Sequence, residues 1–113
     1  MNKPIKVNDG NFEEEVLQEN KPVLVLFYAD WAQLSRITQS YVIKIAKKYG
    51  DHIKVCTLDV DKNQSTSSHY EITSIPSTLL FEGGEIKKKV DEYIPEPELI
   101  NLLELDKLKT TAH

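Results

Sequence analysis

Cysteine is almost absent from this sequence. Its 113 residues include only Cys56, so no disulfide can form within the chain. Long apolar runs are absent too, since no stretch approaches the ~20 residues that a membrane-spanning helix needs. The segment from Met1 to Lys6 lacks the apolar core of a secretory signal. These absences favour a cytoplasmic protein that makes no contact with membranes.

A strong excess of one charge is also absent. The 14 basic and 18 acidic residues give a net charge of −4, which provides no reason to expect nucleic acid or an anionic membrane as a partner. The one dense basic run, Lys87–Lys89, falls in a β-prone segment whose side chains alternate between faces. Such a run is typical of an edge strand, where charge discourages unwanted strand pairing. We expect a monomer.

Signals for cofactors and metals are missing as well. The Gly83–Gly84 pair falls in a predicted turn and not in a phosphate-binding loop. Cysteine and histidine do not occur at zinc-binding spacing. Asp30, Asp59 and Asp61 offer oxygen ligands, but we interpret them as solvated or helix-capping carboxylates. No cofactor and no bound metal are therefore expected.

Alternating strand and helix patterns indicate one α/β domain over residues 1–109, followed by a frayed tail at 110–113. The unbroken apolar run 23–28 is typical of a strand covered on both faces. A stripe of Leu34, Ile37, Tyr41 and Ile45 predicts a long helix that ends near Gly50. The other predicted elements are a short helix at 11–20, a strand at 53–60, a short helix ending near Tyr70, a hairpin at 77–90 and a final helix at 97–108.

This order of elements, together with the segments 21–31, 54–61 and 70–81, resembles the thioredoxin family over roughly residues 5–105. The resemblance implies a thioredoxin fold, with a central mixed β-sheet of four to five strands flanked by about four helices. It also implies the family's activity, protein-disulfide oxidoreduction in cell redox homeostasis. In the family that activity depends on a Trp-Cys-x-x-Cys motif between a strand and a helix.

The resemblance also implies the place of the site. Trp31 matches the indole beside the redox centre, and Pro76 matches a cis-proline that exposes backbone groups to a bound peptide. Ala32 and Ser35 stand at the two cysteine positions. Thiol–disulfide exchange needs a thiolate and a sulfur to attack, which a methyl group and a hydroxyl cannot replace.

The residues that support the redox centre in the family differ here too. Leu26 stands where the family buries an aspartate, and Thr57 stands where it places a lysine. A buried leucine contributes ~1.5–3 kcal/mol of apolar burial, whereas a buried carboxylate is costly. Gln33-Leu34 and Ser40 depart from the family pattern as well. This concerted change favours natural divergence over an engineered replacement of two cysteines, and the genomic reading frame tests the choice.

Other reactive side chains have simpler interpretations. Cys56 lies in an apolar strand, where burial is expected to raise its thiol pKa; the alternative is a monothiol redox role. Ser35 lacks an adjacent base in the sequence, because His52 and His69 lie far along the chain. We expect its hydroxyl to bond to backbone within the first helical turn.

The favoured hypothesis is a redox-inactive module that binds peptides or proteins. Its partner would carry an apolar anchor and a basic flank; the alternative is that Asp91-Glu92 belongs to a plain solvated loop. Two rival functions stay open: a thiol oxidoreductase that lost its cysteines by divergence or engineering, and a pseudo-enzyme that competes with an active paralogue. The predicted peptide-binding groove consists of Trp31, Ser74, Ile75, Pro76, Asp91, Glu92 and Tyr93.

Overall fold

The computed structural model describes residues 2–110, and its centre is a mixed β-sheet with the strand order β1-β3-β2-β4-β5. β3 runs parallel to β1 and β2, whereas β4 is antiparallel to β2 and β5. This arrangement confirms the predicted α/β fold. The strands are β1 (Ile5–Lys6), β2 (Val23–Tyr28), β3 (Lys54–Asp59), β4 (Ser77–Glu82) and β5 (Glu85–Val90).

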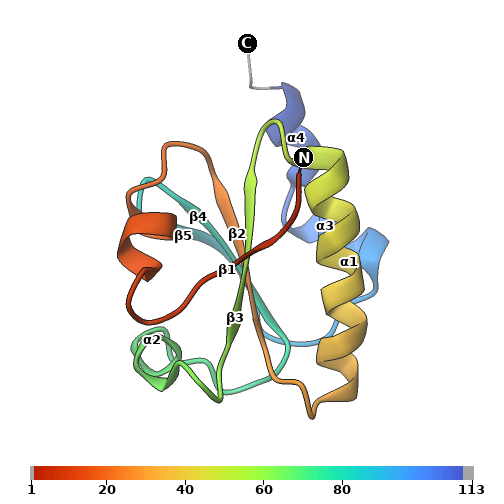
Figure 1. Cartoon of the computed structure of the whole chain (residues 1–113). Helices are drawn as coiled ribbons and strands as arrows, with labels where there is room; N and C mark the ends of the chain where they lie inside the picture. The colour runs from red at the N-terminus through yellow and green to blue at the C-terminus, as the bar shows by residue number, and fades with distance from the viewer. Residues whose placement is uncertain (1, 111–113) are drawn as a thin grey trace.

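Helices cover both faces of the sheet. In Figure 1, α1 and α3 lie on one face, and η1 and α2 lie on the other. No helix within residues 2–110 is both long and apolar enough to cross a membrane. The helices are η1 (Glu13–Leu17), α1 (Gln33–Tyr49), α2 (Gln64–His69), α3 (Glu96–Leu102) and α4 (Leu105–Thr110).

The central strand β2 contributes side chains to two separate hydrophobic cores. All of its residues are buried, as the unbroken apolar run predicts. Leu24 and Leu26 point into a cluster with α1, α3 and α4, whereas Val25 and Phe27 point into a cluster that includes Phe12. Side chains alternate between the faces of a strand, so the residues of β2 pack against the helices on both faces of the sheet.

The predicted edge strand is confirmed. β5, which carries Lys87–Lys89, is the last strand of the sheet and, among residues 2–110, pairs only with β4. The Lys88 side chain forms an ion pair with Glu104 at 2.5 Å. The basic run therefore belongs to an edge strand and its tie to the last helices.

The buried face of α1 differs from the prediction. Leu34 and Ile37 belong to the apolar stripe that predicted this helix, but the two residues are 47% and 38% exposed. Ser35 and Thr38 occupy the buried face instead. Their hydroxyls are satisfied by backbone groups, because Ser35 accepts the Ala29 N–H and Thr38 donates to the Leu34 carbonyl. Two small satisfied side chains let the helix approach the sheet, and the two larger apolar side chains turn outward.

The predicted final helix is wrong as a single element. The helix is interrupted at Glu104, whose backbone has a φ of 55°. This residue separates α3 from α4. Leu103 and Leu105 are buried on either side of the break, whereas Leu102 is 50% exposed. α4 runs through Thr110, one residue into the predicted tail; residues 111–113 lie outside the described part of the chain.

The first helix is also shorter than the predicted 11–20. It spans only Glu13–Leu17, and the Gln18 N–H reaches back five residues to the Glu13 carbonyl at 3.0 Å. Such a wide turn is a π-helical one. It directs Val16 into the core beside Phe12.

Candidate functional site

Strand pairing brings the predicted groove residues to one end of the sheet. Phe27 of β2 pairs with Ser77 of β4, and Thr78 pairs with Val90 of β5. The residues that follow β2, precede β4 and follow β5 therefore meet at the same end. In Figure 1 this end lies at the bottom, where the chain turns from β2 into α1.

Trp31 is exposed but held in place. Its side chain is 72% exposed, and its Nε1–H donates a hydrogen bond to Oδ2 of Asp61 at 2.9 Å. Asp61 follows β3, whose last residue Asp59 pairs with Tyr28. A carboxylate from the neighbouring strand thus orients the indole, which the sequence did not predict.

Ala32 and Ser35 surround the start of α1. Ala32 precedes the helix, and its carbonyl accepts the N–H of Arg36 at 3.1 Å. Ser35 is fully buried, and its Oγ accepts the N–H of Ala29 at 3.1 Å. The prediction that Ser35 bonds to backbone is confirmed, but the partner lies before the helix and not within its first turn. Ser35 has a structural hydrogen bond.

The second strand of the groove begins at Ser74. The Ile75–Pro76 peptide bond is cis, with Pro76 buried and Ile75 half-buried. Ser74 is exposed, and its carbonyl accepts a hydrogen bond from the Ser77 hydroxyl at 2.7 Å. These residues lead directly into β4, next to the end of β2.

Tyr93 contacts α1 as well as the groove end of the sheet. Its hydroxyl lies 2.6 Å from that of Tyr41, and the two ring centroids are 6.2 Å apart. The hydrogen bond to Tyr41 raises the pKa of Tyr93. Asp91 and Glu92 are both exposed just before it. The phenol is therefore an anchor for this loop, and the two carboxylates are exposed to solvent.

Sequence reasoning missed an apolar extension of this surface. Leu34, Ile37 and Tyr41 follow one another at helical spacing, so they form one stripe of α1. Tyr41 at the end of the stripe contacts Tyr93, and Leu34 and Ile37 are exposed. The missed signal is the pair of small polar residues, Ser35 and Thr38, which can sit against a sheet when their hydroxyls bond to backbone.

The interior behind the site is apolar or neutral. Leu26 is fully buried and pairs with Thr57 on β3, which is 8% exposed. Ser40 is exposed on α1, with its hydroxyl donating to the Ile37 carbonyl at 2.6 Å. No ionisable group occupies positions 26 or 57, where the family carries an aspartate and a lysine.

Cys56 lies away from the candidate site. It is fully buried in the cluster on the η1 face of the sheet, away from α1. Burial raises the pKa of its thiol to about 12. The prediction of a core thiol with a raised pKa is confirmed.

Two of the three aspartates accept hydrogen bonds within the protein. Asp59 accepts the backbone N–H of Asp61 at 2.9 Å, and Asp61 accepts the indole N–H of Trp31. Burial and the nearby Asp59 and Asp30 raise the pKa of Tyr28. Among residues 2–110, no group of three or more histidine, cysteine, aspartate or glutamate side chains is placed to hold a metal.

The sheet order and the turn from β2 into α1 define a thioredoxin-fold protein. The family model described as Thioredoxin matches residues 3–105. Thioredoxin 1 of Synechococcus elongatus is 38% identical over 98 residues, which cover 87% of this chain and 92% of that protein. The thioredoxin of Buchnera aphidicola is 43% identical over 86 residues, which cover 76% and 80%.

A thioredoxin from Synechocystis is similar over almost the same span, with 37% identity over 99 residues that cover 88% of this chain and 92% of the relative. The chain therefore belongs to the thioredoxin family. With Cys56 as its only cysteine, it has no thiol at the family's site.

Proposed function

We propose that this chain is a non-catalytic member of the family that binds a peptide or protein segment at the groove end of the sheet. The observation that carries the proposal is the state of Trp31. Its indole is 72% exposed, yet the hydrogen bond to Asp61 already orders it. An ordered aromatic ring offers a large contact area and loses little side-chain entropy on binding.

The surface beside Trp31 supports an apolar anchor on the partner. Leu34 and Ile37 are exposed on the first turns of α1, and Ile75 is half-buried before β4. Exposed apolar side chains that gather at one place mark interaction sites more often than isolated ones do. A leucine or phenylalanine of the partner fits such a surface.

The charge at this end supports a basic flank on the partner. Five acidic residues lie at the ends of β2, β3 and β5 or just beyond them, whereas two basic residues lie within two positions of these acids along the chain. Complementary charge mainly sets partner choice and the rate of association. The acidic residues are Asp30, Asp59, Asp61, Asp91 and Glu92, and the basic ones are Lys62 and Lys89.

The placement of sulfur argues against turnover. Thiol–disulfide exchange begins with a thiolate, and Cys56 is buried on the other face with its thiol pKa raised to about 12. The alternative is a thiol oxidoreductase whose two cysteines were replaced. Turnover of a disulfide substrate with a dithiol reductant, above the uncatalysed rate, would support that alternative and refute a non-catalytic module. Cysteine codons at positions 32 and 35 of the natural gene would show an engineered loss.

We also propose that the protein acts in the cytoplasm as a monomer. A single buried thiol gains no stability from an oxidising compartment.

The test uses the single tryptophan as its probe. Because Trp31 is the only tryptophan in the chain, its fluorescence reports directly on the groove. Two short peptides share a central leucine, one flanked by arginines and one by glutamates. We expect saturable fluorescence changes with the arginine peptide and at least about tenfold weaker binding of the glutamate peptide. Equal affinities, or no saturation with either peptide, would contradict the proposal.

Variants then locate the binding surface. Anisotropy of a labelled arginine peptide should show a large loss of affinity for Trp31→Ala and a smaller loss for Asp91→Asn/Glu92→Gln. The matched control is Glu14→Gln/Glu85→Gln, which removes two exposed carboxylates elsewhere. If the control weakens binding as much as Asp91→Asn/Glu92→Gln does, the effect comes from net charge and the acidic loop has no specific role.

A further inference from the structure

A second concave site lies away from the groove, between α1 and the N-terminal segment. It has a volume of about 480 Å³. Its helical wall includes Gln39, Ile43 and Lys47, which are spaced four residues apart and hence lie on one stripe. Tyr41, which contacts the groove loop, points to the opposite side of the helix. The pocket is therefore separate from the peptide groove.

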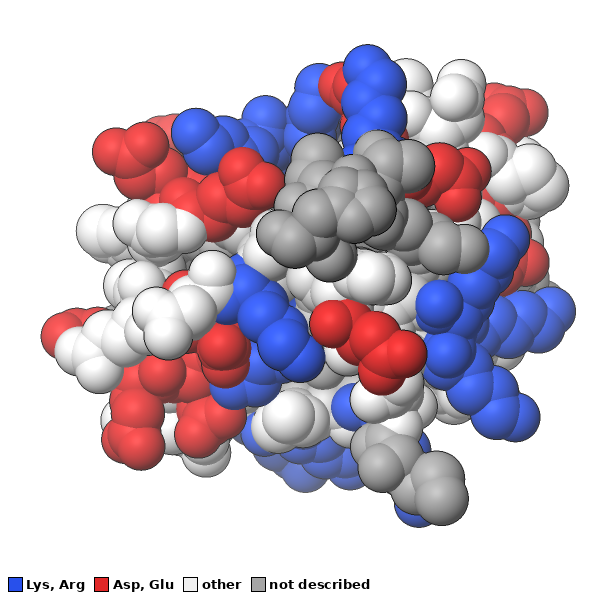
Figure 2. Space-filling view, turned by 90° about the horizontal axis from the view of Figure 1, so that it is seen from above, with Lys and Arg blue, Asp and Glu red and all other residues white. Residues whose placement is uncertain are grey.

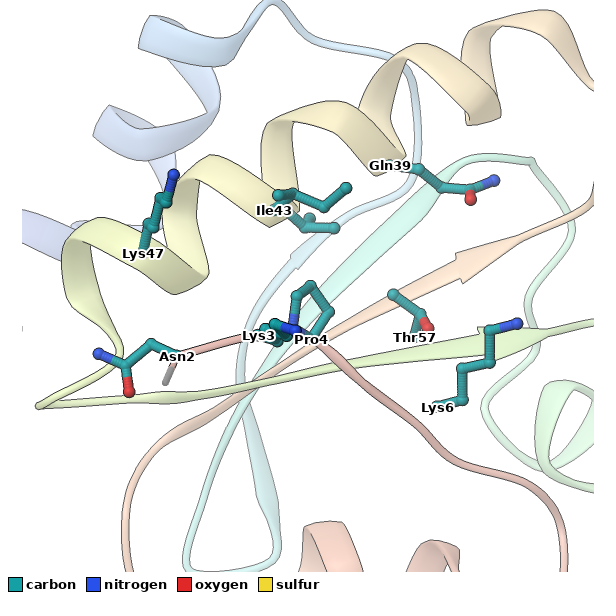
Figure 3. Close-up of a pocket in the computed structure, with 9 residues that line it drawn as sticks. Asn2, Lys3, Pro4, Lys6, Gln39, Ile43, Lys47 and Thr57 are labelled. Atoms are coloured by element: carbon teal, nitrogen blue, oxygen red, sulfur yellow. The ribbon is translucent and has the colours of Figure 1, made fainter.

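The middle of the pocket is apolar. Pro4 of the N-terminal segment faces Ile43 across the space, and Thr57 of β3 lies beside them (Figure 3). Val42 also lines it, and Ile43 is 55% exposed. A volume in the range of about 300–1,000 Å³ with apolar walls and a few polar groups is typical of small-molecule sites.

Three lysines provide all the charge of the lining. They are Lys3, Lys6 and Lys47. Within the described residues none of the three forms an ion pair, whereas Lys44 and Lys54 are paired with glutamates. In Figure 3, Lys47 and Lys6 extend at opposite ends of the pocket. Asp51 does not line the pocket, but it accepts a hydrogen bond at 3.3 Å from Asn2, which does.

The charge on this side contrasts with that of the whole chain. The net charge is −4, but Figure 2 shows a group of blue side chains at the right, on the side of α1, and several red ones at the left. Unpaired cations around an apolar pocket favour a ligand that brings both a negative head and an apolar body.

We propose that this pocket binds a small organic anion with an apolar chain, of the class of medium-chain carboxylates. The positive charge of Lys3, Lys6 and Lys47 attracts the carboxylate to the pocket, and the chain packs against Pro4 and Ile43. The proposal is independent of the peptide groove.

The first experiment compares three probes with the same ten-carbon chain: decanoate, decanol and decyltrimethylammonium. Titrations of the isotope-labelled protein are followed by amide chemical shifts. We expect saturable shifts at Gln39, Ile43 and Thr57 with decanoate, and at least about tenfold weaker binding of the other two. Shifts that centre on Trp31, equal affinities for decanoate and decanol, or no saturable shift would each overturn the proposal.

Matched variants separate the pocket from general charge. Lys3→Glu/Lys6→Glu/Lys47→Glu should lose at least about tenfold in affinity for decanoate. The control has the same net charge, with three exposed lysines reversed elsewhere: Lys21→Glu/Lys62→Glu/Lys87→Glu. A control that loses as much affinity would contradict a specific site.

A second pair of variants tests the apolar wall without unfolding the protein. Ile43→Gln should weaken decanoate binding, whereas Ile86→Gln should not, and both side chains are already exposed. The last experiment measures binding of the protein to vesicles of phosphatidylglycerol. Binding to vesicles without any decanoate shift would assign the lysines to a membrane surface and overturn the proposal of a small-molecule pocket.

Discussion

The Oγ atom of Ser35 accepts the backbone N–H of Ala29 at 3.1 Å, and both residues are fully buried. This bond closes the turn between β2 and α1 at one of the two positions where the family carries a redox cysteine. The position has a structural role in this chain, and the role can be measured.

Removing that hydroxyl should destabilise the protein. Ser35→Ala leaves the buried Ala29 N–H without its acceptor, which costs about 1–3 kcal/mol in the free energy of unfolding. Ser40→Ala is the matched control, because Ser40 is exposed on the same helix; its effect should stay within about 0.5 kcal/mol. Urea unfolding measures both. Equal decreases in the free energy of unfolding would show that the Ser35 hydrogen bond contributes no more to stability than the exposed Ser40 hydroxyl does.

Two new cysteines should form a disulfide at the family's positions. Ala32 and Ser35 are one helical turn apart, with the Arg36 N–H bonded to the Ala32 carbonyl, and residues at this spacing lie about 5–6 Å apart. Ala32→Cys/Ser35→Cys should therefore lose two hydrogens on oxidation, as mass spectrometry detects. Ala32→Cys/Ser40→Cys is the control, since two turns separate its thiols. A double variant that stays reduced would mean that the turn itself has been remodelled.

The native thiol should be inert in the folded protein. Burial raises the pKa of Cys56 to about 12, so almost no thiolate is present at pH 8 and no reagent reaches it. We expect an aromatic disulfide reagent to label Cys56 only after unfolding in guanidinium. Ser40→Cys in a Cys56→Ala background gives an exposed thiol that labels at once. Rapid labelling of the folded natural sequence would restore a redox role for Cys56.

Restoring the family's buried acid should be costly. Leu26 is fully buried in the cluster with α1, and Leu26→Asp removes apolar contacts and buries a carboxylate. We expect a loss of at least about 3 kcal/mol at pH 7. Burial raises the pKa of such a group, so the loss should shrink as the pH falls and the acid becomes neutral. Leu26→Asn controls for shape, and its loss should not change with pH.

Low pH should weaken the ion pair between Lys88 of β5 and Glu104, which lies between α3 and α4. Hydrogen bonds from Lys107 and Lys88 lower the pKa of Glu104 from 4.5 to about 2. Because the folded pKa is the lower one, the contribution of the carboxylate is present above about pH 4.5 and is lost as the pH falls toward about 2. Glu104→Gln should lower the urea midpoint at pH 7 and flatten this loss.

The comparison for Glu104 is Glu98→Gln, which changes an exposed carboxylate of α3 that has no ion pair among the described residues. Its pH dependence should match that of the natural sequence. If Glu104→Gln keeps the full loss between pH 4.5 and pH 2, other carboxylates carry the acid sensitivity.

Much of the fold follows from local residue patterns. The apolar run of β2 and the Gly83–Gly84 hairpin were predicted at or near their observed bounds, since burial on both faces and turn chemistry act over a few residues. The final helix was missed at Glu104, where the break leaves Leu103 and Leu105 both buried and Glu104 pairs with Lys88 of β5. Lys88 lies 16 residues away in the sequence, beyond the reach of a helical pattern.

The candidate site divides in the same way. Residue identity alone removes thiol chemistry from positions 32 and 35, since no fold can turn a methyl group or a hydroxyl into a thiolate. Tertiary packing decided that Asp61 holds Trp31, that Tyr41 meets Tyr93 and that Leu34 faces solvent. Those contacts join residues far apart in the chain, or depend on which side of a helix meets the sheet. Neither is set by local spacing, because each arises only when the layers pack together.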